Sequence, residues 1–491
     1  MTAHFNFDNS YARLPDAFHA RVLPSSARDP RLIALNRPLA GELGLDAGEL
    51  EMPEGVEILA GKRLAPGSEP IATAYAGHQF GGFTPRLGDG RAVLLGEVIG
   101  RDGGRRDIQL KGSGLTPFSR GGDGRAALGP VLREYLVSEA MAALGIPTTR
   151  ALAALRTGET VLRETELPGA VLVRVAASHI RIGTYQFFAA RGDTESVRRL
   201  ADHAMARHDP DAAGAAQPYR AFLDGVVLRQ ARLVARWMEV GFIHGVMNTD
   251  NMSISGETID YGPCAFMDAY GPETFFSSID RGGRYAYGNQ PGIALWNLTR
   301  LAECLLPLLG EGEEAVAAAE ASLTGFAPAY LAAHRDGFRR KLGITTPAEG
   351  DEDLVRDLLG RMAAGKADFT LTFRRLGDAA VDPTRDREVR DLFIDPTAYD
   401  DWAGRWRDRL GSEAMDGAAR RAAMRAANPA FIPRNHRVEE AIAAAVAESD
   451  YGPFERLGRV LARPFDDQPE SAAYAEPPAF DTGAYRTFCG T

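Results

Sequence analysis

His244-Gly-Val-Met-Asn-Thr-Asp-Asn251 and Ile259-Asp-Tyr-Gly262 lie close together in this chain of 491 residues. The first segment ends in the pair Asp250-Asn251, and Asp260 follows nine residues after Asn251. Carboxylate and amide oxygens are hard ligands of the kind that hold Mg²⁺ or Mn²⁺ on substrate phosphates. Short Asp/Asn runs are more often turns. Residues 244–251 alone therefore favour a turn. A metal site is indicated only if other parts of the sequence also point to bound phosphate.

The spacing of these residues resembles the metal-binding pattern of protein kinases. In that pattern a catalytic-loop Asn and the Asp of an Asp-Phe-Gly triplet hold the metal ions. His244 and Asn251 are seven residues apart, as in His-Arg-Asp-x-x-x-x-Asn, but Val246 occupies the position of the catalytic Asp. The sequence thus predicts a kinase-like metal site without the usual catalytic carboxylate. We interpret His244 as a structural residue.

Two paired strands with glycine-rich connections are predicted upstream of this motif. Residues 92–99 form a largely apolar run, and Asp107-Ile-Gln-Leu-Lys111 reads as a second strand that ends in a lysine. Asp89-Gly90 predicts a hairpin turn, and Gly112-Ser-Gly114 follows the lysine. Glycines let backbone amides approach phosphate oxygens, although most glycine-rich runs are ordinary loops.

A strand lysine and a helix glutamate give a second indication of a phosphate site. Pro130–Leu144 is predicted to be a helix because apolar residues recur on one face, and it carries Glu134. In protein kinases such a glutamate pairs with the strand lysine, here Lys111, and places it on the phosphates. A Lys and a Glu at this spacing are common, so the pair gains weight only from its neighbours.

Two arginines follow in a region predicted to be β-strands. Thr149–Val175 contains three apolar runs with strand character. Arg174 lies inside the last run, and Arg181 follows seven residues later. Guanidinium groups bind phosphate oxygens in bidentate fashion. Surface charge is the default role of an arginine, but Arg174 is harder to explain in that way.

The order of predicted elements favours an α+β fold with two lobes. Tyr219–Val240 is predicted to be a long helix that leads into the motif at residues 244–251. Residues 268–292 resemble an activation segment, and the pattern beyond Trp296 is mainly helical. We expect a protein-kinase-like bilobal fold with a β-rich N-lobe and a helical C-lobe. The expected division is an N-terminal extension (1–70), the N-lobe (71–175), the C-lobe (176–345) and a helical C-terminal extension (346–491).

The bulk composition limits the choice of partner and location. The formal net charge is −10, which argues against a sequence-independent nucleic-acid surface and gives no reason to expect an anionic membrane. No apolar run approaches the roughly 20 residues of a membrane span, and the first residues lack the features of a signal peptide. We therefore expect a cytoplasmic monomer that binds neither nucleic acid nor membrane.

Three cysteines are too few for a disulfide framework. Cys304 lies in an apolar run and reads as a buried small hydrophobe. Cys264 follows Asp260-Tyr-Gly-Pro263, and Cys489 is third from the end. The last two are either unrelated free thiols or a reversible redox pair that tethers the tail beside the site. The residues alone leave both interpretations open.

Taken together, the motifs resemble those of one known family, selenoprotein O (SelO/YdiU). The shared motifs, in order, are Gly77-His-Gln-Phe-Gly-Gly-Phe83, Arg86-Leu-Gly-Asp-Gly-Arg91, Gln109-Leu-Lys-Gly-Ser-Gly114, His244-Gly-Val-Met-Asn-Thr-Asp-Asn-Met-Ser-Ile254 and Asp260-Tyr-Gly-Pro263. The resemblance extends from Phe5-Asn-Phe-Asp-Asn-Ser10 to Asn428-Pro-Ala-Phe-Ile-Pro-Arg-Asn435 and the terminal cysteine, which is nearly the whole chain.

The resemblance implies a protein-kinase-like fold whose members transfer AMP from ATP to hydroxyl side chains of proteins. It also implies a reversed nucleotide, with the γ-phosphate where a kinase holds adenine. This orientation would account for Arg174 and Arg181, since an adenine pocket is expected to be apolar. The α-phosphorus would then be the electrophile, and pyrophosphate would be the leaving group.

The resemblance also implies roles for individual residues. Asp250 would accept the proton of the incoming hydroxyl, displaced four residues from the kinase position. Asn251 and Asp260 would hold Mg²⁺, or alternatively Mn²⁺, which spreads the charge that develops on the phosphates. ATP contacts, with Glu134 supporting the lysine, would come from Gly88, Gly90, Arg91, Lys111, Asp123, Gly124, Arg174, Arg181 and Asp260.

In this family the third residue from the end is Cys or selenocysteine, and bacterial relatives can join it to a Cys of the activation segment. The resemblance thus implies a candidate regulatory disulfide between Cys264 and Cys489, which a reducing cytosol would oppose.

Three other functions remain open: UMP transfer with Mn²⁺, γ-phosphoryl transfer by an atypical kinase, and a non-catalytic, nucleotide-regulated scaffold. Val246 and the two arginines count against the kinase. Lys111 and the two metal-ligand candidates count against the scaffold, which would not need them.

Overall fold

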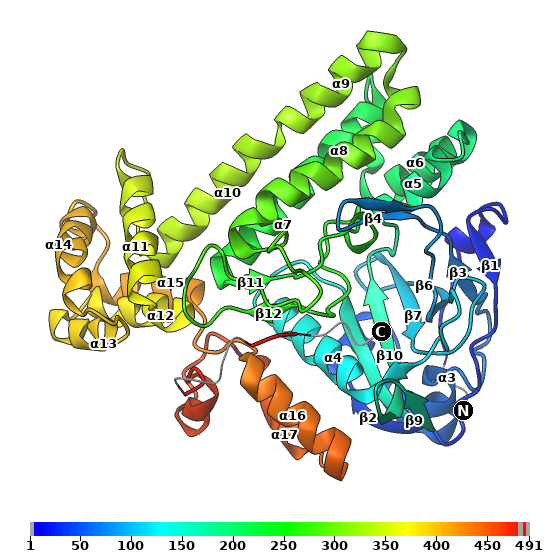
Figure 1. Cartoon of the computed structure of the whole chain (residues 1–491), viewed down its shortest axis with the longest axis horizontal. Helices are drawn as coiled ribbons and strands as arrows, with labels where there is room; N and C mark the ends of the chain where they lie inside the picture. The colour runs from blue at the N-terminus through cyan, green and yellow to red at the C-terminus, as the bar shows by residue number, and fades with distance from the viewer. Residues whose placement is uncertain (1–3, 480–484, 488–491) are drawn as a thin grey trace.

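The computed structural model describes residues 4–479 and 485–487 and shows an α+β protein (Figure 1). One antiparallel sheet holds most of the strands, and helices cover it and extend beyond it. From edge to edge its strands are β1 (His19–Arg21), β3 (Ile71–Thr73), β6 (Ala92–Ile99), β7 (Arg105–Lys111), β10 (Glu166–Ala176), β9 (Arg150–Leu162) and β2 (Arg31–Leu35), with β8 (Ala126–Ala127) paired to β10. The α+β class predicted from the sequence is confirmed.

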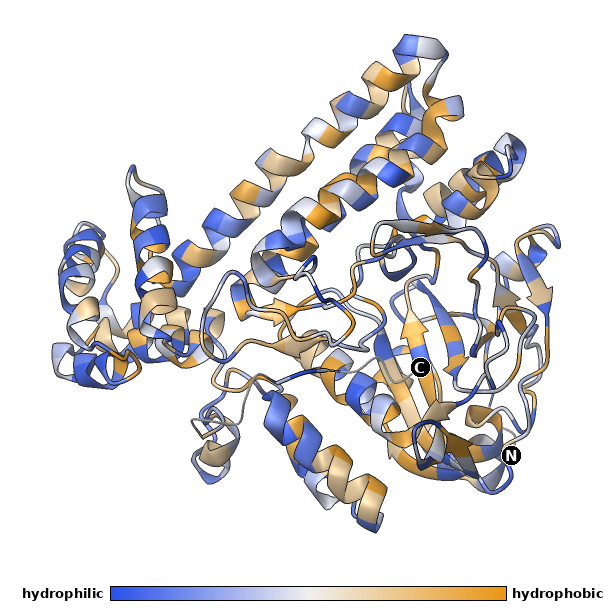
Figure 2. Ribbon diagram, viewed as in Figure 1, coloured by the Kyte–Doolittle hydropathy of each residue, from blue (hydrophilic) through white to orange (hydrophobic). Residues whose placement is uncertain are grey.

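The central strands lie where the sequence predicted them. The apolar run 92–99 forms β6, and the strand predicted over 107–111 begins two residues earlier as β7. β7 pairs with both β6 and β10, so Lys111 lies opposite Leu172. The middle of each strand is buried on both faces, and Figure 2 shows hydrophobic residues gathered on the sheet. Strands buried on both faces lack the alternation of half-exposed ones.

Helices from distant parts of the chain cover the two faces of the sheet. On one face α2 (Ala47–Glu51) and α3 (Pro53–Leu59) share a core with alternate residues of β10, such as Val173. On the other face α4 (Leu128–Ala143), close to the predicted bounds, packs on β9 and β10. There it shares a core with α16 (Asn435–Glu448) and α17 (Gly452–Leu461). The two ends of the chain therefore help to enclose one sheet.

The segment expected as an N-terminal extension supplies both edges of this sheet. β1 pairs with β3, and β2 pairs with β9. Between β2 and α2 the chain forms α1 (Arg37–Glu42), which is capped by Asn36.

A helical layer follows the sheet in the chain. It consists of α5 (Ile182–Ala189), α6 (Thr194–His208), α7 (Pro218–Val240), α8 (Gln290–Leu309), α9 (Gly312–Thr324) and α10 (Phe326–Lys341). Figure 1 shows α8, α9 and α10 extending together away from the sheet. Trp237 and Met238 are buried core residues of α7. One stretch, Tyr287–Leu309, is long and apolar enough to cross a membrane, but a buried core helix passes the same test, and 44% of its apolar window is buried.

The motif at residues 244–251 lies in a loop whose two ends form a pair of short strands. α7 ends at Gly241, whose φ of +70° suits glycine. β11 (Phe242–Ile243) then pairs with β12 (Ala265–Phe266), so residues 244–264 return to their starting point. A separate hairpin, β4 (Gly77–Gln79) with β5 (Gly82–Thr84), packs against this loop.

The C-terminal region forms a second helical core before it returns to the sheet. Its helices are α11 (Asp351–Gly365), α12 (Phe369–Ala379), α13 (Asp386–Arg390), α14 (Thr397–Gly411) and α15 (Gly417–Ala427). Arg434 forms ion pairs at the point where the chain turns back toward the sheet. Its buried Nη1 lies 2.6 Å from Oδ1 of Asp268 and 2.6 Å from Oδ2 of Asp368.

Candidate active site

Three cationic and two acidic side chains meet where the sheet faces the loop 244–264. Lys111 Nζ lies 2.5 Å from Glu134 Oε2 and 3.2 Å from Asp260 Oδ1. Arg174 Nη1 lies 3.2 Å from Glu134 Oε1 and 2.7 Å from Asp260 Oδ1. Arg181 Nη1 contacts Asp260 Oδ2. We call these five residues the charged cluster; it contains the ion pair expected between Lys111 and Glu134.

Each member of the charged cluster comes from a different element of the fold. Lys111 is the last residue of β7, Glu134 comes from α4, and Arg174 comes from β10. Arg181 is the residue before α5, and Asp260 lies in the loop between β11 and β12. Both arginines are only 2% exposed. Buried cations need partners, and the five residues supply them to one another.

Asp260 has an uncommon backbone conformation for a residue with a side chain. Its φ is +64°, in the left-handed region, where a non-glycine residue costs of the order of 1–3 kcal/mol. Burial raises the pKa of Asp260, but Arg181, Arg174 and Lys111 outweigh burial and hold the pKa well below its ordinary value. The carboxylate is therefore ionised at neutral pH and held toward the cations.

Asp250 lies in a turn of 3-10 helix, η3 (Thr249–Asn251), and is covered by the β4–β5 hairpin. Gln79 Nε2 donates to Asp250 Oδ2 at 3.1 Å, whereas Asp250 Oδ1 has no hydrogen-bond partner among the described residues. Burial raises the pKa of Asp250 to about 6, against the opposing effects of Gln79 and Arg181. A carboxylate with a pKa near neutrality and one unpartnered oxygen is suited to accept a proton.

Arg181 joins Asp250 to the charged cluster. Its Nη1 donates to the Asp250 carbonyl oxygen at 2.5 Å as well as to Asp260. Its guanidinium also lies 4.9 Å from the centre of the Tyr75 ring. Burial opposes the charge, but Asp260 and Tyr75 help to raise the pKa of Arg181 above its ordinary value, so the side chain is a permanent cation.

Two other residues of the motif, Asn251 and His244, differ in their contacts. Asn251 Nδ2 donates to the Val246 carbonyl oxygen at 3.0 Å, so its amide oxygen is directed elsewhere. His244 is buried with Nε2 2.9 Å from the Ile259 carbonyl oxygen, and burial lowers its pKa. These contacts give His244 a structural role.

The predicted metal ligands Asn251 and Asp260 are one amide and one carboxylate. No group of three or more His, Cys, Asp or Glu residues that could hold a metal occurs in the described part of the chain. Mg²⁺ in nucleotide sites commonly takes one or two carboxylates together with phosphate oxygens and water. The pair therefore fits a metal that arrives with a nucleotide better than one held by protein alone.

The predicted nucleotide loops meet beyond the end of β7. Gly112 N–H donates to the Arg91 carbonyl oxygen at 2.7 Å. Gly124 has a φ of +68°, and a Cβ there would lie 2.2 Å from the Gly114 backbone. Gly88, with a φ of +79°, is equally restricted because a Cβ would lie 2.3 Å from the Phe118 ring. Glycine is thus required at two of the predicted positions, at Gly124 by the neighbouring backbone and at Gly88 by the Phe118 ring.

One residue of these loops keeps an untested prediction, and one expected turn does not form. Asp123, predicted to contact ATP, has a side chain that is 43% exposed and pairs with Arg163 at 2.8 Å. The predicted hairpin turn at Asp89-Gly90 is wrong, because β5 pairs with β4 while β6 pairs with β3 and β7. Asp89 is instead buried, and its Oδ2 accepts hydrogen bonds from the Thr73 N–H and hydroxyl groups.

Three polar residues that contact the site are not among the predicted site residues. Gln79 contacts Asp250, and Gln109 contacts Arg174 and Asp89. Gln109 could have been noticed as an amide inside an apolar strand. Gln79 and Asp89 gave no comparable signal because polar residues are common in glycine-rich loops.

The candidate disulfide cannot be placed, since Cys489 lies outside the described residues. Cys264 is buried, and burial raises the pKa of its thiol to about 12. Thr487 is the last described residue; its hydroxyl donates to the Pro263 carbonyl oxygen at 2.6 Å, and it bridges to Ser277. The end of the described chain therefore lies next to Cys264. Cys304 is buried in α8, as expected.

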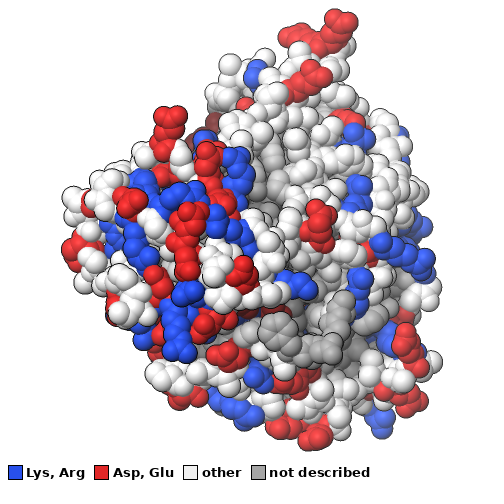
Figure 3. Space-filling view, turned by 60° about the vertical axis from the view of Figure 1, so that its left-hand side comes forward, with Lys and Arg blue, Asp and Glu red and all other residues white. Residues whose placement is uncertain are grey.

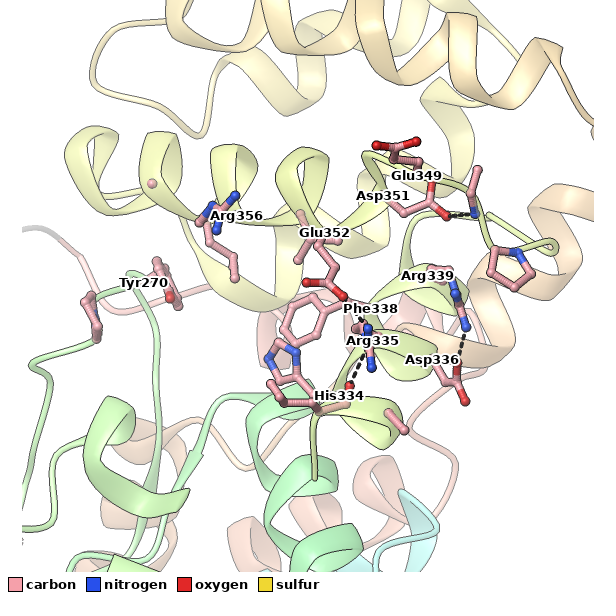
Figure 4. A pocket seen from close by; sticks show the side chains of 18 of the residues that line it. Tyr270, His334, Arg335, Asp336, Phe338, Arg339, Glu349, Asp351, Glu352 and Arg356 are labelled. Atoms are coloured by element: carbon pink, nitrogen blue, oxygen red, sulfur yellow. Dashed lines mark hydrogen bonds and ion pairs between the residues drawn. The ribbon is translucent and has the colours of Figure 1, made fainter. Parts of the chain in front are cut away.

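A cavity of about 930 Å³ lies away from the charged cluster, between α10 and α11 (Figure 4). Tyr270, Phe338 and Leu359 contribute to its lining. At its edge Arg335 Nη1 lies 2.6 Å from Glu352 Oε1. None of the residues predicted for nucleotide binding lines this cavity, so we do not assign it to the active site.

Acidic and basic side chains are interspersed on the face formed by the C-terminal helices (Figure 3). Arg361 pairs with Asp357 and Asp401, and Arg405 also pairs with Asp357. The described residues of this face therefore do not form the single-sign surface that attracts nucleic-acid backbones.

A buried cluster of cations beside glycine-rich loops and a carboxylate with a raised pKa is a combination suited to an enzyme that acts on a phosphorylated substrate. A family model described as protein adenylyltransferase SelO matches residues 2–462. The chain is 71% identical to protein nucleotidyltransferase YdiU of Methylorubrum extorquens and 67% identical to that of Bradyrhizobium diazoefficiens, with both chains covered completely in each comparison. The chain therefore belongs to the SelO family, and it is an enzyme of the protein nucleotidyltransferase class.

Proposed function

We propose that this enzyme transfers AMP from ATP to Ser, Thr or Tyr hydroxyls of other proteins and releases pyrophosphate. The observation that carries the proposal is the double contact of Arg181. One guanidinium touches Asp260 of the charged cluster and the backbone of Asp250. A phosphate bound by the cluster would therefore lie close to a carboxylate with a raised pKa.

The charged cluster would bind the triphosphate. Its three cations outnumber its two carboxylates, so it carries a formal charge of +1 that an anionic substrate would neutralise. Arg174 and Arg181 would hold the terminal phosphate, in the reversed orientation that the family resemblance implies. Glycine-rich loops around Gly88 and Gly124 would let backbone amides approach the nucleotide.

Asp250 would act as the proton acceptor for the attacking hydroxyl. The hydroxyl oxygen would form a bond to the α-phosphorus, the bond to pyrophosphate would break, and the hydroxyl proton would pass to the Asp250 carboxylate. Proximity would supply much of the rate enhancement, because a carboxylate is a modest base. Asn251 and Asp260 would hold Mg²⁺, which neutralises charge developing on the phosphates.

We infer that the α+β architecture is a protein-kinase-like bilobal fold. The ion pair of a strand lysine with a helix glutamate supports this, as does the loop with Asn251 and Asp260. The same likeness to protein kinases leaves γ-phosphoryl transfer as a second candidate reaction. Val246 disfavours that reaction, because it stands where a kinase has its catalytic Asp. UMP transfer with Mn²⁺ uses the same groups and differs only in base and metal.

We also propose that oxidation regulates the enzyme through Cys264 and Cys489. The proximity of Thr487 to Pro263 supports this, since it brings the tail within two residues of Cys489 to the segment that carries Cys264. The high thiol pKa of Cys264 makes it slow to react in the buried state. We further propose that the enzyme is a monomer in the cytoplasm, where ATP and protein acceptors are available.

The proposal is tested with ATP labelled at either the α- or the γ-phosphate. The enzyme is incubated with Mg²⁺, denatured casein and each label, and protein-bound label is measured. AMP transfer predicts label from the α-position only. Label from the γ-position only would show a kinase, and no label from either would support a non-catalytic scaffold. Replacing ATP by α-labelled UTP with Mn²⁺ tests the uridylyl alternative.

A further inference from the structure

Arg174 is held by a buried amide that the proposed mechanism does not use. Gln109 Oε1 accepts hydrogen bonds from Arg174 Nε at 3.2 Å and from Nη2 at 2.5 Å. The two residues lie opposite each other on the paired strands β7 and β10. Gln109 is fully buried. The remaining terminal nitrogen, Nη1, is the one that faces Glu134 and Asp260.

Gln109 is held in turn by the glycine-rich loop. Its Nε2 donates to Asp89 Oδ2 at 3.3 Å. Asp89 is 2% exposed, and the same oxygen accepts the N–H and hydroxyl of Thr73. The Asp89 carbonyl oxygen accepts a further hydrogen bond from Thr116 Oγ1 at 2.6 Å. Asp89 therefore has a fixed position between Gly88 and Gly90.

Only a neutral amide suits the position between these two charges. It accepts from the guanidinium on one side and donates to the carboxylate on the other. A carboxylate at residue 109 would face Asp89 with like charge. An apolar side chain would remove the acceptor of Arg174 Nε and Nη2 and one of the donors to Asp89 Oδ2. The Oε1 and Nε2 positions of Gln109 follow from these partners, since the reverse orientation would set N–H groups against the guanidinium.

We propose that Gln109 is a positioning residue for recognition of the terminal phosphate, and that Asp89 links it to the glycine-rich loop. A guanidinium binds phosphate well only when its plane is fixed. Gln109 fixes the plane of Arg174 through two of its nitrogens and turns Nη1 toward the cluster. The inference rests on the proposed function, because it assigns Arg174 to the γ-phosphate of ATP.

The test measures preference for ATP over ADP and does not need AMP transfer. Binding of the α,β-methylene analogues of ATP and ADP is measured by calorimetry with Mg²⁺, because neither analogue can donate AMP with loss of pyrophosphate. We expect Gln109→Leu to weaken the ATP analogue at least tenfold and the ADP analogue less than threefold. Gln109→Glu, which has the same size, should also lose the preference, since its charge would compete with phosphate for Arg174.

Two comparisons separate positioning from general damage. Gln468→Leu removes another buried glutamine, one that contacts Val460 and Arg463 far from the site, and should leave both affinities unchanged. In the Arg174→Lys background, Gln109→Leu should cause no further loss of ATP preference. Equal weakening of both analogues, no weakening, or additive losses in the double variant would overturn the inference. Failure of AMP transfer in the label experiment would instead contradict the proposed function, while the binding preference remains measurable.

Discussion

Arg174 Nη1 lies 2.7 Å from Asp260 Oδ1, although 86 residues separate the two in the chain. This ion pair joins β10, in the middle of the sheet, to the loop between β11 and β12. Lys111 and Arg181 converge on the same carboxylate. Asp260 is thus the point at which the strands and the loop 244–264 meet, and its left-handed backbone conformation accompanies this convergence.

Asp260→Ala is expected to abolish metal-dependent nucleotide binding and AMP transfer. The three cations remain, so metal-independent binding of ATP should persist or increase. Calorimetry with ATP in Mg²⁺ and in EDTA measures both quantities, and Asp336→Ala on the surface serves as the control. A variant that transfers AMP like the wild type would show that Asp260 is not a metal ligand.

Gly77→Ala is expected to reduce AMP transfer at least tenfold. A Cβ at residue 77 would lie 2.4 Å from Asp250 Oδ1, so the methyl group must displace the Asp250 carboxylate, the proposed proton acceptor, or the β4–β5 hairpin. Gly82→Ala is the matched control, because a Cβ there has its nearest neighbour at 3.5 Å. Transfer is measured with α-labelled ATP. Equal activity of the two variants would contradict the proposed role of Asp250, which the hairpin contacts.

Glu257→Gln is expected to change the pH dependence of stability. Burial raises the pKa of Glu257 to about 7, although the Ala177 N–H and Ser255 hydroxyl oppose the shift. The folded state therefore holds the proton more tightly than the unfolded state, whose Glu pKa is near 4.5. Stability is lost as the pH rises from about 4.5 to about 7, by an amount of the order of 3 kcal/mol.

The glutamine variant does not ionise and should lack this loss. Urea unfolding at pH 5 and pH 8 should show the free energy of unfolding of wild type falling relative to that of Glu257→Gln. Parallel behaviour of the two proteins would mean that Glu257 titrates normally in the fold.

Oxidation is expected to link Cys264 to Cys489 and to lower AMP transfer. The tail is already seated beside Pro263 through Thr487. A peptide map of the oxidised protein should contain the crosslinked pair, and Cys304→Ser should leave it unchanged because Cys304 is buried in α8. Free thiols at both positions after oxidation would remove the redox proposal.

The central strands, α4 and α7 could be predicted from sequence because their patterns are local. Apolar runs with strand or helix periodicity determine them without reference to distant residues. The pairing of Lys111 with Glu134 was also predictable, since the strand and helix that carry them are close in sequence.

Other features depend on contacts between distant segments. No local pattern shows that residues 1–70 supply both sheet edges, or that α16 and α17 return to α4. The convergence of Arg174 and Arg181 on Asp260 likewise depends on strand register and on the loop between β11 and β12. The hairpin turn expected at Asp89-Gly90 failed for a related reason: the buried Asp89 carboxylate is used in a tertiary hydrogen-bond network.

The most direct test of the account compares wild type with Asp250→Asn. The amide is nearly the same size as the carboxylate, but it cannot accept the hydroxyl proton. If Asp250 is the proton acceptor, Asp250→Asn binds the α,β-methylene analogue of ATP with unchanged affinity and loses at least 100-fold in transfer of α-label to casein, consistent with general-base contributions of about 10²–10⁴-fold. Transfer within threefold of wild type at equal affinity would contradict it.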